Sequence, residues 1–100
     1  MTDLFTLQGR TALITGGSRG IGRMIAAGFL QQGAKVYISS RKAADCDQTA
    51  KELSEHGTCI SIPADVSTME GIAALVATLK SHESSLDILV TCWSDFAYYG

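Results

Sequence analysis

The stretch Thr11-Ala-Leu-Ile-Thr-Gly-Gly-Ser-Arg-Gly-Ile-Gly22 decides the fold, because it places a glycine-rich turn between a strand and a helix. Its first five residues form an apolar run, which predicts a buried strand that ends at Gly16. From Gly20 onward apolar residues recur every three or four positions, which predicts an amphipathic helix. The residues expected on its apolar face are Ile21, Met24, Ile25, Gly28 and Phe29.

Three further strands and two further helices follow in alternation. The first helix is predicted to end at Gly33, and the strands are predicted at residues 36–38, 58–62 and 86–90. The third helix is predicted to begin with the capping-box pair Ser67 and Glu70. The residues expected to be buried are Cys46, Thr49, Ala50 and Leu53 on the second helix, and Ile72, Leu75, Val76 and Leu79 on the third.

The resulting order, β-α-β-α-β-α-β, predicts an α/β fold. Strands that alternate with helices of this length are joined by right-handed crossovers, so they lie parallel in a sheet that is covered on both faces. This is the N-terminal half, or slightly more, of a doubly wound parallel sheet. The chain of 100 residues has one Pro and no linker-like stretch, which predicts one domain at 1–90 and a divergent aromatic tail at 91–100.

Gly16, Gly20 and Gly22 have the GxxxGxG spacing of a dinucleotide-binding turn. The first glycine allows a sharp exit from the strand, the second lets the backbone approach a pyrophosphate, and the third lets the helix pack closely on the sheet. The helix N-terminus adds N–H groups and a partial positive charge. A plain tight turn is the alternative, and a P-loop is excluded because Arg23-Met24 stand where Lys-Ser/Thr is required. We therefore predict phosphate binding at this turn.

The residues that end the second strand, Ser39-Ser40-Arg41-Lys42, include no acid. In dinucleotide folds an acid at this place binds the ribose 2′-hydroxyl, whereas an Arg accommodates a 2′-phosphate. Arg41 can hold such a phosphate through two hydrogen bonds, and Lys42 and Arg19 are expected to add charge nearby. The alternative is that these basic residues are simply solvated. We predict NADP(H) rather than NAD(H).

Asp65 and Val66 follow the third strand, at the edge where open α/β sheets bind their ligands. The Asp65 carboxylate can accept a hydrogen bond from the adenine amino group, with Val66 beside the ring. Asp65 can equally cap the helix that follows, and the spacing alone leaves both roles open.

Composition narrows the functional classes. Ten acidic and eight basic residues give a formal net charge of −2, which argues against nucleic acid as an obligate partner. No apolar run is long enough to cross a membrane, and the N-terminus has no signal-peptide pattern. The three cysteines, at 46, 59 and 92, share no metal-ligand spacing. We therefore expect reduced thiols, no metal site and a cytoplasmic protein.

Together these motifs resemble the short-chain dehydrogenase/reductase family over residues 5 to 90, and among its members the NADPH-dependent 3-ketoacyl reductases in particular. The resemblance implies a Rossmann-like sheet and a site for NADP(H), in which Ser40 and Arg41 select the 2′-phosphate. The residues that it implies for this cofactor site are Gly16, Ser18, Arg19, Gly20, Ile21, Gly22, Ser40, Arg41, Asp65 and Val66.

The chain departs from the family pattern after the fourth strand. Thr91-Cys92-Trp93-Ser94 stand where the family has Asn-Asn-Ala-Gly, and a Trp there either blocks the adenosine side of the cleft or turns outward. The family's catalytic Ser and Tyr-x-x-x-Lys pair have no counterpart, since no Lys follows Tyr98 or Tyr99. We therefore expect no catalytic residue in these 100 residues and a chain that is inactive alone.

Two functions follow from these expectations. The first is the NADP(H)-binding portion of an oxidoreductase that transfers hydride between NADPH and a carbonyl or secondary alcohol, including 3-ketoacyl substrates. The second is a non-enzymatic module that binds a dinucleotide or another subunit. Self-association is expected at the strand predicted at 86–90, because an apolar sheet edge is a template for pairing. A methyltransferase or flavoprotein half is disfavoured, since Arg41 replaces the acid that would hold a ribose diol.

Overall fold

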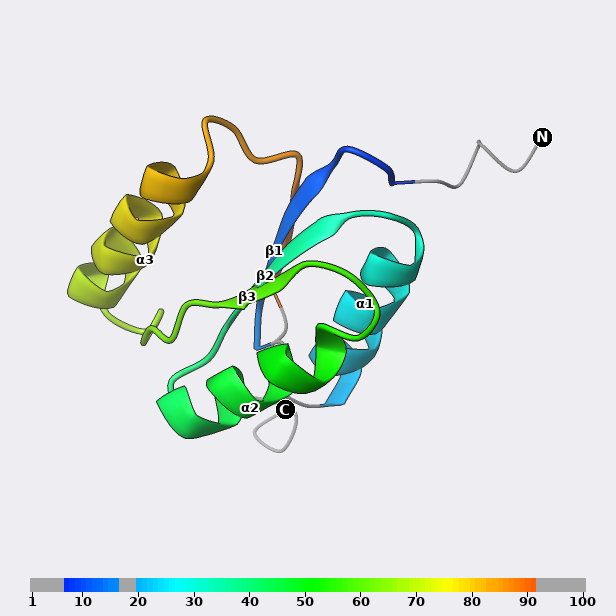
Figure 1. Ribbon diagram of the computed structural model, residues 1–100. Helices are drawn as coiled ribbons and strands as arrows, with labels where there is room; N and C mark the ends of the chain where they lie inside the picture. The colour runs from blue at the N-terminus through cyan, green and yellow to red at the C-terminus, as the bar shows by residue number, and fades with distance from the viewer. Residues whose placement is uncertain (1–6, 17–19, 92–100) are drawn as a thin grey trace.

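Four parallel strands form one sheet, and helices lie on both of its faces (Figure 1). The computed structural model describes residues 7–16 and 20–91. The strands lie in the order β3-β2-β1-β4, and each neighbouring pair is parallel. The fold is therefore the Rossmann-like α/β half that the sequence predicts. Its elements are β1 (Thr11–Thr15), α1 (Gly20–Gln31), β2 (Lys35–Ser39), α2 (Ala43–Leu53), β3 (Cys59–Ser61), α3 (Met69–His82) and β4 (Ile88–Thr91).

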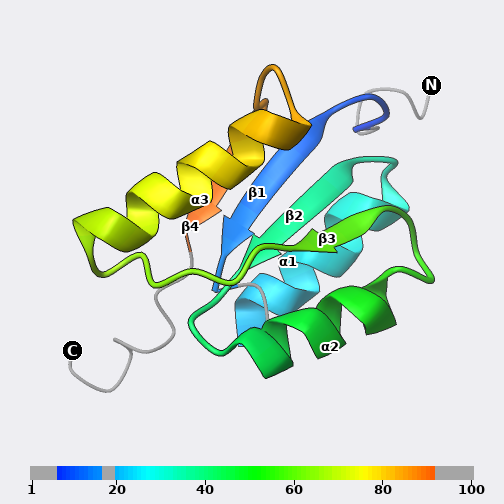
Figure 2. The same ribbon diagram turned by 60° about the vertical axis from the view of Figure 1, so that its left-hand side comes forward.

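The two faces of the sheet carry separate cores. Helices α1 and α2 lie together on one face, and α3 covers the other (Figure 2). Side chains alternate along each strand, so Ala12 and Ile14 pack toward α1 and α2, whereas Leu13 packs toward α3. Among the described residues the core under α1 and α2 is the larger of the two.

The buried face of α1 differs from the predicted one. Ile21 and Met24 are 68% and 73% exposed, whereas Gly22, Ala26 and Leu30 are buried. These three residues follow one another at intervals of four, and the first two are small enough to bring the helix close to the sheet. The prediction was wrong because it weighted large apolar residues, whereas close packing requires small ones here. The residues of the predicted face that do pack against the core are Ile25 and Phe29.

The buried face of α2 is the predicted one, but α3 buries only Leu75 and Leu79. Ile72 and Val76 were predicted to be buried, and they are 39% and 45% exposed. Beside α3, on the same face of the sheet, Leu89 of β4 is 60% exposed. Within the described ranges α3 is the one helix on this face, so the second apolar flank of α3 has no helix to pack against.

Strand β4 forms one edge of the sheet, as predicted for residues 86–90. Asp87 joins it to β1, because the Thr11 N–H donates to Asp87 Oδ2 at 2.9 Å and the Asp87 N–H donates to the Thr11 carbonyl at 3.0 Å. The opposite edge, β3, is only three residues long and is soon followed by Pro63, which cannot pair. The β4 edge is therefore the less protected of the two.

Cys46 of α2 and Cys59 of β3 are buried free thiols. Burial, with a smaller contribution from Cys46, raises the pKa of Cys59 from its usual 9.0 to about 11. We expect iodoacetamide at pH 8 to modify Cys59 at least about 100-fold more slowly in the folded than in the urea-unfolded chain, because the thiolate is the reactive form. Mass spectrometry of the labelled peptides measures both rates, and equal rates would contradict the buried position.

Candidate functional site

The predicted site residues follow the carboxyl ends of the parallel strands, which lie together at one end of the sheet (Figure 2). The glycine turn follows β1, Ser40-Arg41 follows β2, and Asp65-Val66 comes after β3. Ligands of open α/β sheets bind outside this end. Ser18 and Arg19 of the turn, and Cys92-Trp93-Ser94 after β4, lie outside the described residues.

Backbone hydrogen bonds join the three loops into one surface. The Gly16 N–H donates to the Ser39 carbonyl at 2.7 Å, which ties the glycine turn to the end of β2. The Ala64 N–H donates to the Ser40 carbonyl at 3.0 Å, which ties the end of β2 to the segment before Asp65. Motifs that lie far apart in the sequence are therefore direct neighbours at this end of the sheet.

The glycines at the two ends of the glycine turn lie within the described residues, and both adopt a conformation that suits glycine. Gly16 and Gly20 have φ values of +76° and +64°, in the left-handed region that favours glycine. Helix α1 begins at Gly20 and has no acidic residue in its first turn, so none of its own carboxylates offsets the positive end of the helix dipole there. Gly22 is buried on the face of α1 toward the sheet. This end of α1 can hold an anion through backbone N–H groups.

Two buried hydroxyl groups at the end of β2 have no hydrogen-bond partner in the part of the chain that the structure describes. They are Ser39 Oγ and Ser40 Oγ, and Ser39 as a whole is 1% exposed. Burying a hydroxyl unpaired costs about 1–3 kcal/mol, so such groups in folded proteins mark places where a water or a ligand supplies the partner. Ser40 is the predicted contact of the 2′-phosphate, and an unpartnered donor beside Arg41 fits a phosphate oxygen.

Arg41 and Asp65 bring opposite charges to the same surface. Arg41 is exposed, and its charge is close enough to contribute to lowering the pKa of Asp65. The larger cause of that lowered pKa is hydrogen bonding from Ser67, through its hydroxyl and then its backbone N–H. The guanidinium can hold a phosphate, and the ionised carboxylate can accept a hydrogen bond from an amino group.

The sequence left two roles open for Asp65, binding of adenine and capping of the helix that follows, and the structure assigns the cap to another residue. The N-cap of α3 is Thr68, whose hydroxyl accepts the Gly71 N–H at 2.9 Å, so the predicted capping box of Ser67 and Glu70 was wrong. Ser67 instead donates from its N–H and its hydroxyl to Asp65 Oδ1, at 3.0 and 2.5 Å. Asp65 therefore holds the turn ahead of α3 with one carboxylate oxygen, and no hydrogen bond to the other, Oδ2, is found among the described residues.

Ser39 and Ser67 were not singled out by the sequence reasoning. The signal for Ser39 was a hydroxyl residue at the end of a strand, directly after the apolar run of residues 36–38. Ser67 was noticed only as a helix cap, because spacing along the chain does not reveal that both of its donors turn back to Asp65.

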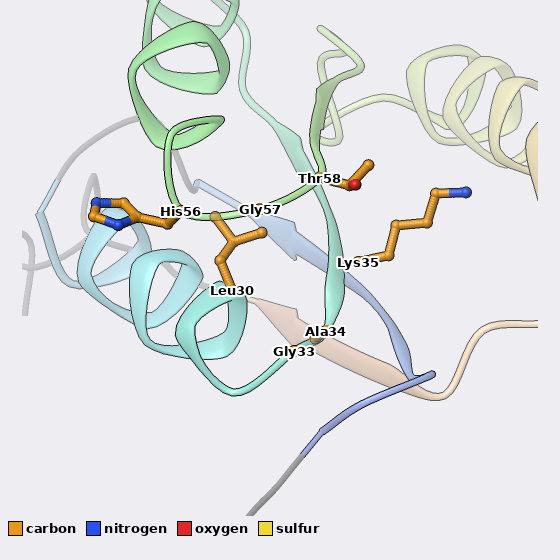
Figure 3. Close-up of a pocket in the computed structure, with 7 residues that line it drawn as sticks. All are labelled: Leu30, Gly33, Ala34, Lys35, His56, Gly57 and Thr58. Atoms are coloured by element: carbon orange, nitrogen blue, oxygen red, sulfur yellow. The ribbon is translucent and has the colours of Figure 1, made fainter.

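A hollow of about 450 Å³ lies at the other end of the strands from the predicted site, near the amino ends of β2 and β3. Figure 3 shows Lys35 and His56 at its margins with their side chains pointing in opposite directions, so their polar groups do not converge. Lys35 Nζ is paired with Glu83 at 2.6 Å, and Glu83 also accepts the buried Tyr37 hydroxyl at 2.6 Å. This cluster fastens α3 to β2 and is structural.

Within residues 7–16 and 20–91, no group of three or more His, Cys, Asp or Glu side chains is arranged to hold a metal ion. None of the helices described is both long and apolar enough to cross a bilayer.

Comparison with known proteins gives consistent matches. The family described as short chain dehydrogenase matches residues 10–93. A rhamnolipids biosynthesis 3-oxoacyl-[acyl-carrier-protein] reductase of Pseudomonas aeruginosa is 51% identical over 90 residues, which are 90% of this chain and 35% of that protein. The chain therefore spans about a third of the length of this relative.

Solved structures share the fold. The active-site complex of Pseudomonas aeruginosa RhlG with NADP aligns with a TM-score of 0.90 at 50% identity and covers 92% of this chain and 37% of that one. A 3-ketoacyl-(acyl-carrier-protein) reductase of Brucella melitensis in complex with NADH aligns with a TM-score of 0.76 at 34% identity, over 84% of this chain and 34% of that one. Since one neighbour is bound to NADP and the other to NADH, the choice of cofactor has to be argued from this chain's own residues.

Proposed function

Because this chain belongs to the short-chain dehydrogenase family, we propose that it binds NADP(H) at the carboxyl ends of its strands, as the nucleotide-binding portion of an oxidoreductase. The observation that carries the proposal is the buried, unpartnered Ser40 hydroxyl beside the cationic Arg41. A 2′-phosphate supplies the acceptor that Ser40 lacks and the negative charge that Arg41 pairs with. A free ribose diol can accept a hydrogen bond from Ser40, but it offers Arg41 no negative charge to pair with.

Each predicted residue has a role in this proposal. The pyrophosphate and the neighbouring ribose lie against the glycine turn and the start of α1, Ser40 and Arg41 hold the 2′-phosphate, and Asp65 and Val66 hold the adenine. The residues of the first group are Gly16, Ser18, Arg19, Gly20, Ile21 and Gly22.

The proposed reaction of the whole enzyme is hydride transfer between NADPH and a carbonyl or secondary alcohol. A 3-oxoacyl thioester is the proposed substrate class, on the strength of the Pseudomonas aeruginosa relative. The bound nicotinamide supplies the hydride, and the residues of this chain bind and orient the adenosine end of the cofactor. We assign no catalytic residue within these 100 residues. A cytoplasmic location is part of the proposal, because free thiols suit a reducing compartment.

Adenosine 2′,5′-bisphosphate tests the proposal, because it differs from AMP only in the 2′-phosphate. We expect it to bind at least about 10-fold more tightly than AMP, since a charged hydrogen bond contributes about 1.5–3 kcal/mol. Isothermal titration of the folded chain measures both affinities. Equal affinities would remove the case for a 2′-phosphate site.

A second candidate function, subunit association, is favoured by the open β4 edge and the exposed Leu89 beside it. We expect the chain to sediment as a dimer or larger species at micromolar concentration, and the Leu89→Lys variant to shift it toward monomer. The matched control is Met24→Lys, at an exposed apolar residue of α1 on the other face of the sheet. If the unmodified chain sedimented as a monomer at all micromolar concentrations, subunit association would be ruled out.

A further inference from the structure

The backbone of Asp65 is held by the residues that follow it. The Thr68 N–H and hydroxyl both donate to the Asp65 carbonyl, at 3.4 and 3.3 Å. Gly71, in the first turn of α3, lies against the same carbonyl so closely that a Cβ at this position would overlap the oxygen. The start of α3 therefore sets where the Asp65 peptide lies.

The side chain of Asp65 is held separately, by Ser67. The two donors of Ser67 both reach Oδ1, which fixes the plane of the carboxylate. This use of Ser67 is not needed to cap α3, because Thr68 already performs the capping. Fixing one carboxylate oxygen determines where the other one points.

The Asp65 carboxylate is ionised at neutral pH, as an aspartate ordinarily is, and the two hydrogen bonds from Ser67 are the main reason why its pKa is lowered further. In its ionised form the group can only accept hydrogen bonds. Adenine presents an amino group at C6, which donates. A 6-oxopurine such as hypoxanthine presents an oxygen there, which an ionised carboxylate repels.

We propose that Ser67 is a positioning residue that fixes the Asp65 carboxylate so that its free oxygen accepts the adenine amino group, and that it thereby makes the site select adenine over 6-oxopurines. The inference rests on the proposed function, since it concerns the adenine end of the same cofactor. It adds a residue that orients the contact and a base specificity that follows from it.

The test compares NADPH with its hypoxanthine analogue, reduced nicotinamide hypoxanthine dinucleotide phosphate, by isothermal titration. We expect the unmodified chain to prefer NADPH about 10- to 100-fold, the value of one hydrogen bond to a charged group. Ser67→Ala should lower this preference at least about threefold, mainly by weakening NADPH binding. Ser67→Thr, which keeps the hydroxyl, should restore it.

Ser81→Ala is the matched control, because the Ser81 hydroxyl donates to the Thr78 carbonyl within α3, away from Asp65. It should leave the preference unchanged, and circular dichroism shows whether each variant is folded. A preference that survives Ser67→Ala, or one that Ser81→Ala lowers equally, would overturn the inference. If the unmodified chain binds both cofactors equally, the positioning role fails while the proposed function stands; if it binds neither, both fail.

Discussion

Replacing Arg41 with Ala is expected to weaken NADPH binding about 30- to 100-fold while NADH binding changes by less than about twofold. The guanidinium is the one group at the end of β2 that can hold a phosphate through two parallel hydrogen bonds, and Ser40 adds a single neutral donor beside it. NADH has no 2′-phosphate, so its affinity does not depend on this contact. Isothermal titration with both cofactors measures the difference.

Two lysines serve as controls for Arg41. Lys42 is the next residue along the chain, and Lys42→Ala should weaken NADPH binding only about threefold, because it contributes charge at longer range. Lys51, exposed on α2, should have no effect when replaced with Ala. If Arg41→Ala weakened NADPH and NADH equally, the Arg41 side chain would not be selecting the 2′-phosphate.

Replacing Ile38 with Ala is expected to lower the free energy of unfolding by about 2–5 kcal/mol. Ile38 is 0% exposed in β2, between Ile14 of β1 and Ser61 of β3, and its carbonyl accepts the Cys46 thiol. A chain of this length has a total stability of only about 5–15 kcal/mol at best, so the loss is a large fraction of it. Urea denaturation followed by circular dichroism measures the change.

The matched control is Leu89→Ala on β4, where the side chain is 60% exposed. Its truncation should change the free energy of unfolding by less than about 0.5 kcal/mol, because little apolar area leaves the core. A cost for Leu89→Ala as large as that for Ile38→Ala would contradict the assignment of the core to the strands' inner faces.

The fold was predictable to the level of element order and direction. Alternating strand and helix periods, with glycine at 16, 33 and 57 near the breaks between them, were sufficient because each signal is local. Which individual helix residues are buried was less predictable from the sequence. The predicted buried face of α1 was misplaced, because the pattern alone does not show that α1 approaches the sheet through Gly22 and Ala26. The predicted face of α3 was too wide, because the pattern does not show that one flank of α3 has no neighbour within residues 7–16 and 20–91.

The candidate site shows the same division between local and spatial signals. The sequence alone could nominate the glycine turn, Arg41 and Asp65, because their chemistry is carried by residue type and by position after a strand. The unpartnered hydroxyls of Ser39 and Ser40 and the bonds from Ser67 to Asp65 could not be predicted, because they depend on what lies nearby in space.

The most direct test of the central claim is isothermal titration of the unmodified, folded chain with NADPH and, in parallel, with NADH. We predict saturable binding of NADPH at one site per chain, at least about 10-fold tighter than that of NADH. Equal affinities would show that Ser40 and Arg41 do not select the cofactor. The absence of any binding heat with either cofactor, in a sample that circular dichroism shows to be folded, would contradict the proposal that the carboxyl ends of the strands form a dinucleotide site.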